Sequence, residues 1–264
     1  GLEIVLQLAA LAAVGFFAGT VNTLAGGGSL LTLPALIFFG LPAGVANGTN
    51  RLGVVVQSAV AAWRFRRGDA LPLGLVARLA PAMLVGAVAG AWVSVDIDEQ
   101  LFRRIIGVAM LGMGAVIVFR PKLGAAPREE GEEGDEAALP WFRQGAVGVV
   151  VQTVTFLALG FYAGFLQAGV GVFALSALVL VAGTDLVRGN AVKVALVGIV
   201  TVPALAIFVW EDLVAWGPGL SVAAGQIFGG WLGARLALTR GAGLVRFVLA
   251  AVVVVSATKL LGVW

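Results

Sequence analysis

The sequence contains no cysteine and no histidine, and only 12% of its 264 residues are charged. The two missing residue types exclude a Cys/His zinc site, a disulfide framework, a Ser-His or Cys-His nucleophile pair and a haem attachment motif. Soluble proteins carry about 25% charged residues, whereas 60% of this chain is hydrophobic. A water-soluble protein is therefore excluded, and we expect an all-α polytopic membrane protein in a lipid bilayer.

Basic residues are only slightly in excess, with a formal net charge of +3. In so apolar a chain we interpret this excess as a sign of cytoplasmic loops rather than of nucleic-acid binding. No glycine-rich loop is followed by Gly-Lys-Ser/Thr, which excludes an ATP-binding P-loop. No basic segment precedes the first apolar run, so we expect no cleavable signal peptide.

Long apolar segments predict the spanning helices, each of which needs roughly 20 residues. They are 3–24, 45–65, 71–94, 101–119, 142–166, 187–210, 213–237 and 243–263. Segments 29–39 and 172–182 are about half that length. Each of these two follows a glycine cluster and ends at a glycine, so we expect a helix, a break and a half-helix at both places. Segment 121–140 is acidic, with proline at each end, and predicts a disordered loop.

The chain also resembles itself. In the opening helices the offset is 145, which aligns Gly15–Gly19 with Gly160–Gly164 and Asn22 with Gln167. After the glycine clusters the offset is 143, which aligns Gly26 with Gly169, Gly28 with Gly171 and Asn47 with Asn190. Two homologous halves, 1–120 and 141–264, therefore flank the acidic loop 121–140, as is typical of secondary transporters.

The charges favour halves of opposite orientation. If each opening helix and its half-helix form a re-entrant hairpin, most of the lysine and arginine residues collect on one side of the membrane, among them Arg64, Arg66 and Arg67. Acidic residues such as Asp96, Glu99 and Glu211 then collect on the other side. A parallel arrangement scatters the basic residues over both sides. We therefore predict two inverted-topology repeats, each a re-entrant hairpin plus three spanning helices, with the acidic loop cytoplasmic and both termini outside.

Polar residues share one face of the helix that follows each half-helix. In the first half they are Asn47, Asn50 and Arg51, and in the second Asn190 and Lys193. Lipid cannot hydrogen-bond such a face, so it should point into the bundle. One interpretation is that the cations reach the interface or bind the carbonyls that end the half-helices.

The other interpretation is an anion site. The half-helices are expected to begin at Ser29 and Val172, and helix N-termini bind oxyanions through free N–H groups. Asn22 and Gln167 at the breaks would add amide groups. Neither polar face carries an opposing carboxylate, which favours a small anion over a metal ion or an amine.

Three segments resemble the signature of the TauE/SafE sulfite exporter family: Gly15-Phe-Phe-Ala-Gly19, Asn22-Thr-Leu-Ala-Gly26-Gly27-Gly28-Ser29 and Val45-Ala-Asn47-Gly-Thr49-Asn50-Arg51. The resemblance covers the whole chain and implies a permease of the bacterial or archaeal cytoplasmic (inner) membrane that moves sulfite, organosulfonates or related sulfur oxyanions, usually outward. The second half departs from the first, with Gly-Val-Gly for Gly-Gly-Gly and Lys193 for Asn50. The two half-sites need not contribute equally.

We therefore predict a secondary transporter of small sulfur-containing oxyanions that works by alternating access. A passive anion channel and an uptake permease for thiosulfate or another small anion remain alternatives. We expect no enzymatic activity, cofactor or metal, and the coupling ion and oligomeric state stay open. The predicted substrate-binding residues are Asn22, Gly26, Gly27, Gly28, Ser29, Asn47, Thr49, Asn50, Arg51, Gln167, Gly169, Gly171, Asn190 and Lys193.

Overall fold

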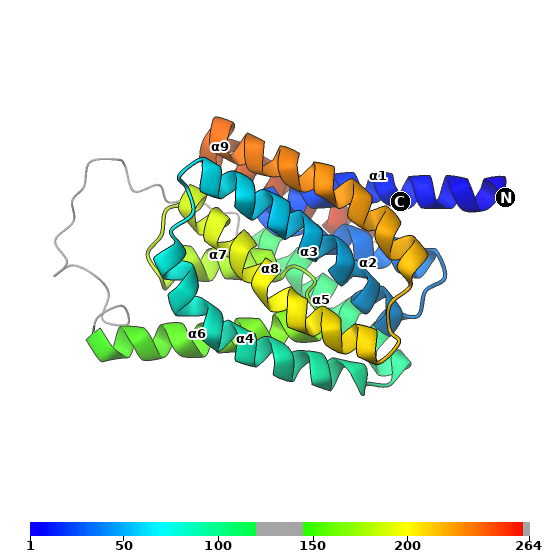
Figure 1. The fold of residues 1–264 in the computed structure, drawn as a ribbon, viewed down its shortest axis with the longest axis horizontal. Helices are drawn as coiled ribbons and strands as arrows, with labels where there is room; N and C mark the ends of the chain where they lie inside the picture. The colour runs from blue at the N-terminus through cyan, green and yellow to red at the C-terminus, as the bar shows by residue number, and fades with distance from the viewer. Residues whose placement is uncertain (120–144, 261–264) are drawn as a thin grey trace.

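The computed structural model describes the backbone of residues 1–119 and 145–260 and the side chains of 1–109 and 145–239. Within these ranges the regular structure is entirely helical (Figure 1). The helices are α1 (Leu2–Ala25), α2 (Ser29–Phe38), α3 (Ala43–Arg67), α4 (Leu73–Val95), α5 (Glu99–Phe119), α6 (Gly145–Phe165), α7 (Val170–Leu180), α8 (Leu186–Trp210) and α9 (Trp216–Leu260). The predicted acidic loop 121–140 lies outside the described residues.

The expected helices are present, with ends shifted by a few residues. In the described part of the chain, α1, α4, α6 and α8 are long and apolar enough to cross a membrane. The short helices α2 and α7 have 10 and 11 residues, which confirms the two predicted half-length segments. An all-helical polytopic membrane protein is therefore the observed class.

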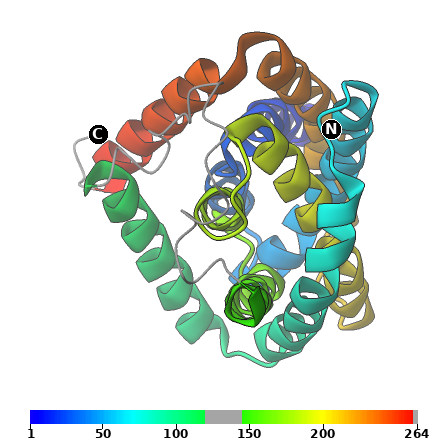
Figure 2. The same cartoon turned by 90° about the vertical axis from the view of Figure 1, so that its left-hand side faces the viewer.

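One prediction of helix boundaries is wrong. Segments 213–237 and 243–263 were expected to be separate helices, but residues 216–260 form the single 45-residue helix α9. At 1.5 Å per residue it is about 68 Å long, more than twice a hydrocarbon core of about 30 Å. Gly241 and Gly243 do not interrupt it, because membrane helices tolerate glycine. Figure 2 shows that α9 instead changes direction along its length.

Small residues bring helices of the two halves into close contact. A Cβ atom at Gly15 in α1 would lie 2.3 Å from the carbonyl oxygen of Val222 in α9, and one at Gly86 in α4 would lie 2.1 Å from that of Leu157 in α6. Small residues permit such close backbone approach in membrane helices. Each opening helix, α1 or α6, thus packs on a helix of the other half, and the halves interlock.

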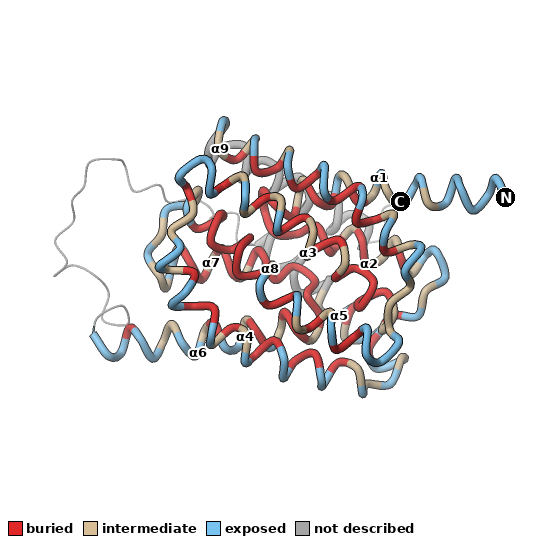
Figure 3. The backbone as a smooth tube through the Cα atoms, viewed as in Figure 1, coloured by how far each residue is buried: buried red, intermediate tan, exposed pale blue. Residues whose placement is uncertain are grey.

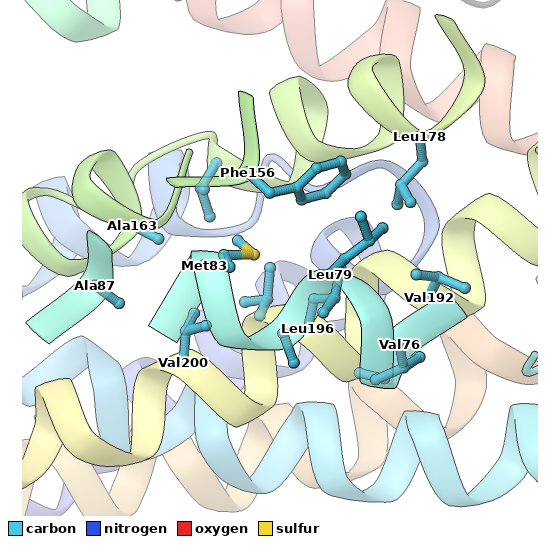
Figure 4. Packing of buried hydrophobic residues seen from close by; sticks show 14 of the residues in the cluster. Val76, Leu79, Met83, Ala87, Phe156, Ala163, Leu178, Val192, Leu196 and Val200 are labelled. Atoms are coloured by element: carbon cyan, nitrogen blue, oxygen red, sulfur yellow. The ribbon is translucent and has the colours of Figure 1, made fainter. Parts of the chain in front are cut away.

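The central helices α3 and α8 run antiparallel. Gly48, near the start of α3, lies against the carbonyl of Leu213, just after α8, whereas Gly198 in the middle of α8 lies against Ser58 in α3. These two helices carry much of the buried surface, while the outer faces of the surrounding helices are exposed (Figure 3). Figure 4 shows Met83, Phe156 and Leu196 packed together between α4, α6 and α8.

Most of the described charged residues lie at the two ends of the bundle. At the end where α3 begins, the Glu99 carboxylate accepts hydrogen bonds from the backbone N–H groups of Ala43 and Gly44 at 2.7 and 3.3 Å. At the other end, the last turn of α3 carries Arg64, Arg66 and Arg67. The cores of the helices between these ends contain few charges, so Arg51 and Lys193 stand out.

Candidate functional site

The two glycine breaks meet inside the protein. Gly26, between α1 and α2, has a φ of 87°. A Cβ atom there would lie 2.2 Å from the carbonyl carbon of Gly171, and one at Gly171 would lie 2.4 Å from the Cα of Gly26. Both positions therefore require glycine because two backbones occupy the space of a side chain. The contact joins equivalent regions of the two halves.

The first break ends α1 and starts α2 within a few residues. The N–H of Gly26 donates to the carbonyl of Asn22 at 2.8 Å, and α2 begins at Ser29, as predicted. The N–H groups of Leu30 and Leu31 donate to the carbonyls of Gly27 and Gly28 at 3.0 and 2.9 Å. The amides that precede them are those that a helix start leaves without an intrahelical acceptor.

The second break has the same plan with different side chains. Gln167 and Gly169 both adopt positive φ, 61° and 69°, and α7 begins at Val170, two residues before the expected Val172. The Tyr162 hydroxyl, one turn earlier, donates to the carbonyl of Ala168 at 2.6 Å. This break is thus braced by a phenol that the first half lacks.

In the first half, the polar face of α3 is occupied by internal contacts. Asn50 bonds two hydroxyls at the start of α2: its Nδ2 donates to Ser29 at 3.2 Å, and its Oδ1 accepts from Thr32. Asn47 Nδ2 donates to Ser94 Oγ at 3.3 Å and to the carbonyl of Phe165 at 2.9 Å. Most of the amide groups on this face are therefore already paired.

Thr49 lies on another contact. Its hydroxyl accepts a hydrogen bond from the N–H of Ala215, just before α9, at 2.9 Å. The structure therefore places Thr49 at the junction of α3 with α9, and its described hydrogen bond reaches neither break. The predicted contact of Thr49 with the substrate is therefore not supported by a hydrogen bond to either break.

The two buried cations reach across between the halves. Arg51, on α3, donates to the carbonyls of Ala163, at 3.1 Å, and Gly164 near the end of α6. Lys193, on α8, donates to the carbonyls of Asn22 and Thr23 near the end of α1, at 3.0 and 3.2 Å. Both side chains are fully buried. Each cation therefore neutralises the negative end of an opening helix that belongs to the other half.

This arrangement corrects one part of the sequence interpretation. The cations do bind helix-terminal carbonyls, but those of α1 and α6 rather than those of the half-helices. Lys193 keeps one of its three N–H donors beyond these two contacts. The Nε of Arg51 is buried without a hydrogen-bond partner, so each cation retains a donor for a ligand.

Several buried polar atoms near these residues have no partner. Both amide atoms of Asn190 are unpaired although the residue is 0% exposed, and so are Gln167 Oε1 and Asn47 Oδ1. Buried polar groups are almost always hydrogen-bonded. At offset 143, Ala237 takes the place of Ser94, so Asn190 lacks the hydroxyl partner that Asn47 has. Among the amides of the candidate site, Asn190 consequently has the most hydrogen-bonding capacity left for a ligand.

Several residues of this polar network were not predicted from the sequence. Asn22 Nδ2 donates to Gln57 Oε1 at 3.0 Å, and Gln57 Nε2 donates to Thr23 Oγ1 at 3.1 Å. Gln167 Nε2 donates to Thr201 Oγ1 at 2.6 Å. Thr201, on α8, was not among the residues predicted for the site. The available signal for Gln57, Thr32 and Ser94 was a polar residue inside an apolar helix.

The donor set does not suit a metal ion. Among the described residues, no group of three or more carboxylate, histidine or cysteine side chains lies together. The site instead offers amides, hydroxyls, backbone N–H groups and two cations. Such groups bind oxyanions.

Comparison with known proteins gives consistent matches. The family model described as "Sulfite exporter TauE/SafE" matches residues 11–260. A "Probable membrane transporter protein" of Haemophilus influenzae is 30% identical over 90% of this chain and 88% of its own length. The "Probable membrane transporter protein YfcA" of Escherichia coli (strain K12) is 30% identical over 97% of this chain and 90% of its own. No solved structure matches the chain.

Proposed function

We propose a substrate and a mechanism for this chain, which belongs to the sulfite exporter TauE/SafE family and is a membrane transporter. The substrate is a small sulfur-containing oxyanion such as sulfite or an organosulfonate. The chain carries it out across the cytoplasmic membrane as a secondary transporter. The observation on which this rests is the contact between Gly26 and Gly171, with the two buried cations beside the breaks.

The anion binds where the two breaks meet. The starts of α2 and α7 supply N–H groups and the positive end of each helix dipole. Lys193, Arg51 and Asn190 add the donors that the internal contacts leave free. An oxyanion pairs these buried donors, which otherwise lack the partners that buried polar groups normally have.

Alternating access follows from two inverted repeats. The directions of the helices support this arrangement: α3 and its counterpart α8 run antiparallel, and each opening helix packs on the other half. In Figure 1, α2 lies toward the end where α1 begins, and α7 lies toward the end where α6 begins. Each break thus forms the tip of a hairpin, and the hairpins enter from opposite sides. Rocking one half against the other exposes the shared point to each side in turn.

The coupling requires no carboxylate of the protein. Four described helices, α1, α4, α6 and α8, are long and apolar enough to cross the membrane. Among them, the one carboxylate is that of Glu3, near the start of α1. A proton therefore travels on the substrate, as bisulfite. An interior-negative membrane potential favours anion export by about 2.3 kcal/mol per charge per 100 mV.

Flux in proteoliposomes tests the proposal. Vesicles with the purified protein are loaded with sulfite, sulfoacetate, thiosulfate, sulfate or chloride, and release is followed with and without an imposed potential. Sulfite or a sulfonate that leaves faster than chloride, with saturation, supports a transporter. Non-saturating anion currents in planar bilayers would instead show a channel. Accumulation of thiosulfate inside initially empty vesicles, without release of sulfite or a sulfonate from loaded ones, would show an uptake permease.

A further inference from the structure

A second cationic site lies far from the breaks, where the end of α3 meets α9. The guanidinium carbon of Arg64, on α3, lies 4.7 Å from the ring centroid of Trp231, on α9, and that of Arg235 lies 5.5 Å from the same ring. Arg67 lies 4.3 Å from the ring of Trp63. Arg64 and Arg235 thus share the Trp231 ring, and we call these three residues, with the neighbouring pair Arg67–Trp63 at the end of α3, the Arg-Trp cluster.

No acidic side chain in the described part of the chain forms an ion pair with these arginines. Among the described residues the ion pairs are Arg103–Glu99 and Arg188–Asp185, at the starts of α5 and α8. The Nε of Arg64 is buried without a hydrogen-bond partner. A guanidinium that stacks on an indole uses its face and keeps its in-plane N–H donors for an acceptor. Within residues 1–109 and 145–239 the cluster therefore presents donors without an acceptor and positive charge without an ion-pair partner.

The surroundings indicate the ligand. Trp63 and Trp231 are 48% and 38% exposed, and Phe228, one turn before Trp231, is 68% exposed. Exposed apolar side chains on a membrane helix face the acyl chains, and tryptophan marks the headgroup level. Arginine clusters at this level bind phosphate groups of anionic lipids. The combination fits a molecule with a phosphate head and apolar tails.

We propose that the Arg-Trp cluster binds the headgroup of an anionic phospholipid. The phosphate oxygens accept from Arg64 and Arg235, which both lie against the Trp231 ring, and the acyl chains lie along the exposed face of α9. The lipid ties the end of α3 to α9, in addition to the packing of Phe65 with Ala234 and the close approach of Gly68 to Leu238. This role is independent of the transported anion.

Lipid binding is measured on the full-length protein in neutral detergent. Phosphatidylglycerol, cardiolipin or phosphatidylcholine is titrated in mixed micelles, and bound lipid is counted by native mass spectrometry while the midpoint of thermal unfolding is recorded. The tested variant is Arg64→Gln with Arg235→Gln. The matched control is Arg78→Gln, an exposed arginine on α4 that donates to Gln152.

The proposal predicts that an anionic lipid binds and raises the unfolding midpoint, whereas phosphatidylcholine does not. In the double variant, binding weakens by about thirtyfold, since each basic residue near an anionic surface contributes roughly fivefold. The control keeps wild-type binding. Equal binding by the double variant overturns the proposal, as does an equal shift with inorganic phosphate, which would show a site for soluble anions. If the double variant does not fold, Arg235→Gln alone, at an exposed position, gives the same comparison with a smaller change.

Discussion

The first and second breaks share a backbone plan but differ in what holds them. In the first half, Asn50 binds the hydroxyls of Ser29 and Thr32 at the start of α2. At offset 143 the corresponding positions are Lys193, Val172 and Leu175, so no such tie exists in the second half. There the Tyr162 hydroxyl braces the break instead. One half is held by side chains of the next helix, and the other by its own opening helix.

The difference separates structural polar groups from available ones. Asn47 has two donor contacts, whereas its counterpart Asn190 has none. Lys193 occupies the position that corresponds to Asn50. It does not tie the half-helix, and its ammonium group donates instead to carbonyls near the end of α1. We infer that the first half contributes mainly rigidity and the second mainly ligand contacts.

The largest effect is expected where the breaks touch. Gly26→Ala places a methyl group 2.2 Å from the backbone of Gly171 and strains a residue with a φ of 87°. We expect loss of folded protein, measured by size-exclusion chromatography in detergent. The matched control is Gly40→Ala, where φ is 89° and nothing lies within 4 Å. Equal behaviour of the two variants would show that backbone strain, not contact between the breaks, matters.

Removing the crossed cations comes next. Lys193→Met and Arg51→Met each remove two hydrogen bonds to carbonyls of the other half. The Asn22 carbonyl keeps its bond from Gly26, and each carbonyl left unpaired costs roughly 1–3 kcal/mol. Both variants should therefore unfold at a lower temperature, and neither should bind sulfite like the wild type. Arg188→Met, at an exposed position of α8, is the control. Unchanged ligand-induced stabilisation in both variants would remove these cations from the site.

A paired comparison of amides sharpens the division between the halves. Asn50→Ala breaks two hydrogen bonds and should destabilise the protein by about 1–3 kcal/mol. Asn190→Ala breaks none of the described hydrogen bonds, so its thermal stability should stay at or above that of the wild type while its sulfite affinity falls. Scanning calorimetry and isothermal titration measure the two quantities. The reverse pattern would assign ligand binding to the first half.

The smallest effects concern the starts of the central helices. Asp185 caps α8 by accepting from the N–H groups of Val187 and Arg188, both at 2.9 Å, and Asp185→Ala should cost about 1 kcal/mol. The start of α3 is capped by Glu99 from a distant part of the chain. Because that contact joins two helices, Glu99→Gln should also loosen α5, which hydrogen exchange can detect.

The Glu99 cap also predicts a pH dependence. Partial burial acts to raise the pKa of Glu99, but hydrogen bonds from Ala43, Arg103 and Gly44 outweigh it and hold the pKa below its ordinary value of 4.5. The stabilisation is therefore complete above that value and is lost as the pH falls through the folded-state pKa. In that acidic range the midpoint of thermal unfolding should fall more for the wild type than for Glu99→Gln. Parallel pH profiles would contradict this.

Local sequence patterns predicted the elements better than their contacts. Glycine clusters before short apolar segments were sufficient to predict α2 and α7, because a break needs positive φ and a half-helix needs few residues. The polar face of α3 followed from helical spacing. The crosswise contacts of Arg51 and Lys193 join residues more than 100 positions apart, and no local pattern encodes such a pairing. The continuity of α9 was missed because glycine weakens a helix without always ending it.

The position of the bound anion tests the central claim most directly. Selenite has the shape and charge of sulfite, and its selenium can be located by anomalous diffraction from crystals of the protein. We predict an anomalous peak between the starts of α2 and α7, within hydrogen-bonding distance of Lys193 or Asn190. A peak confined to the Arg-Trp cluster or to the exposed ends of the helices, with none between the breaks, would contradict the account.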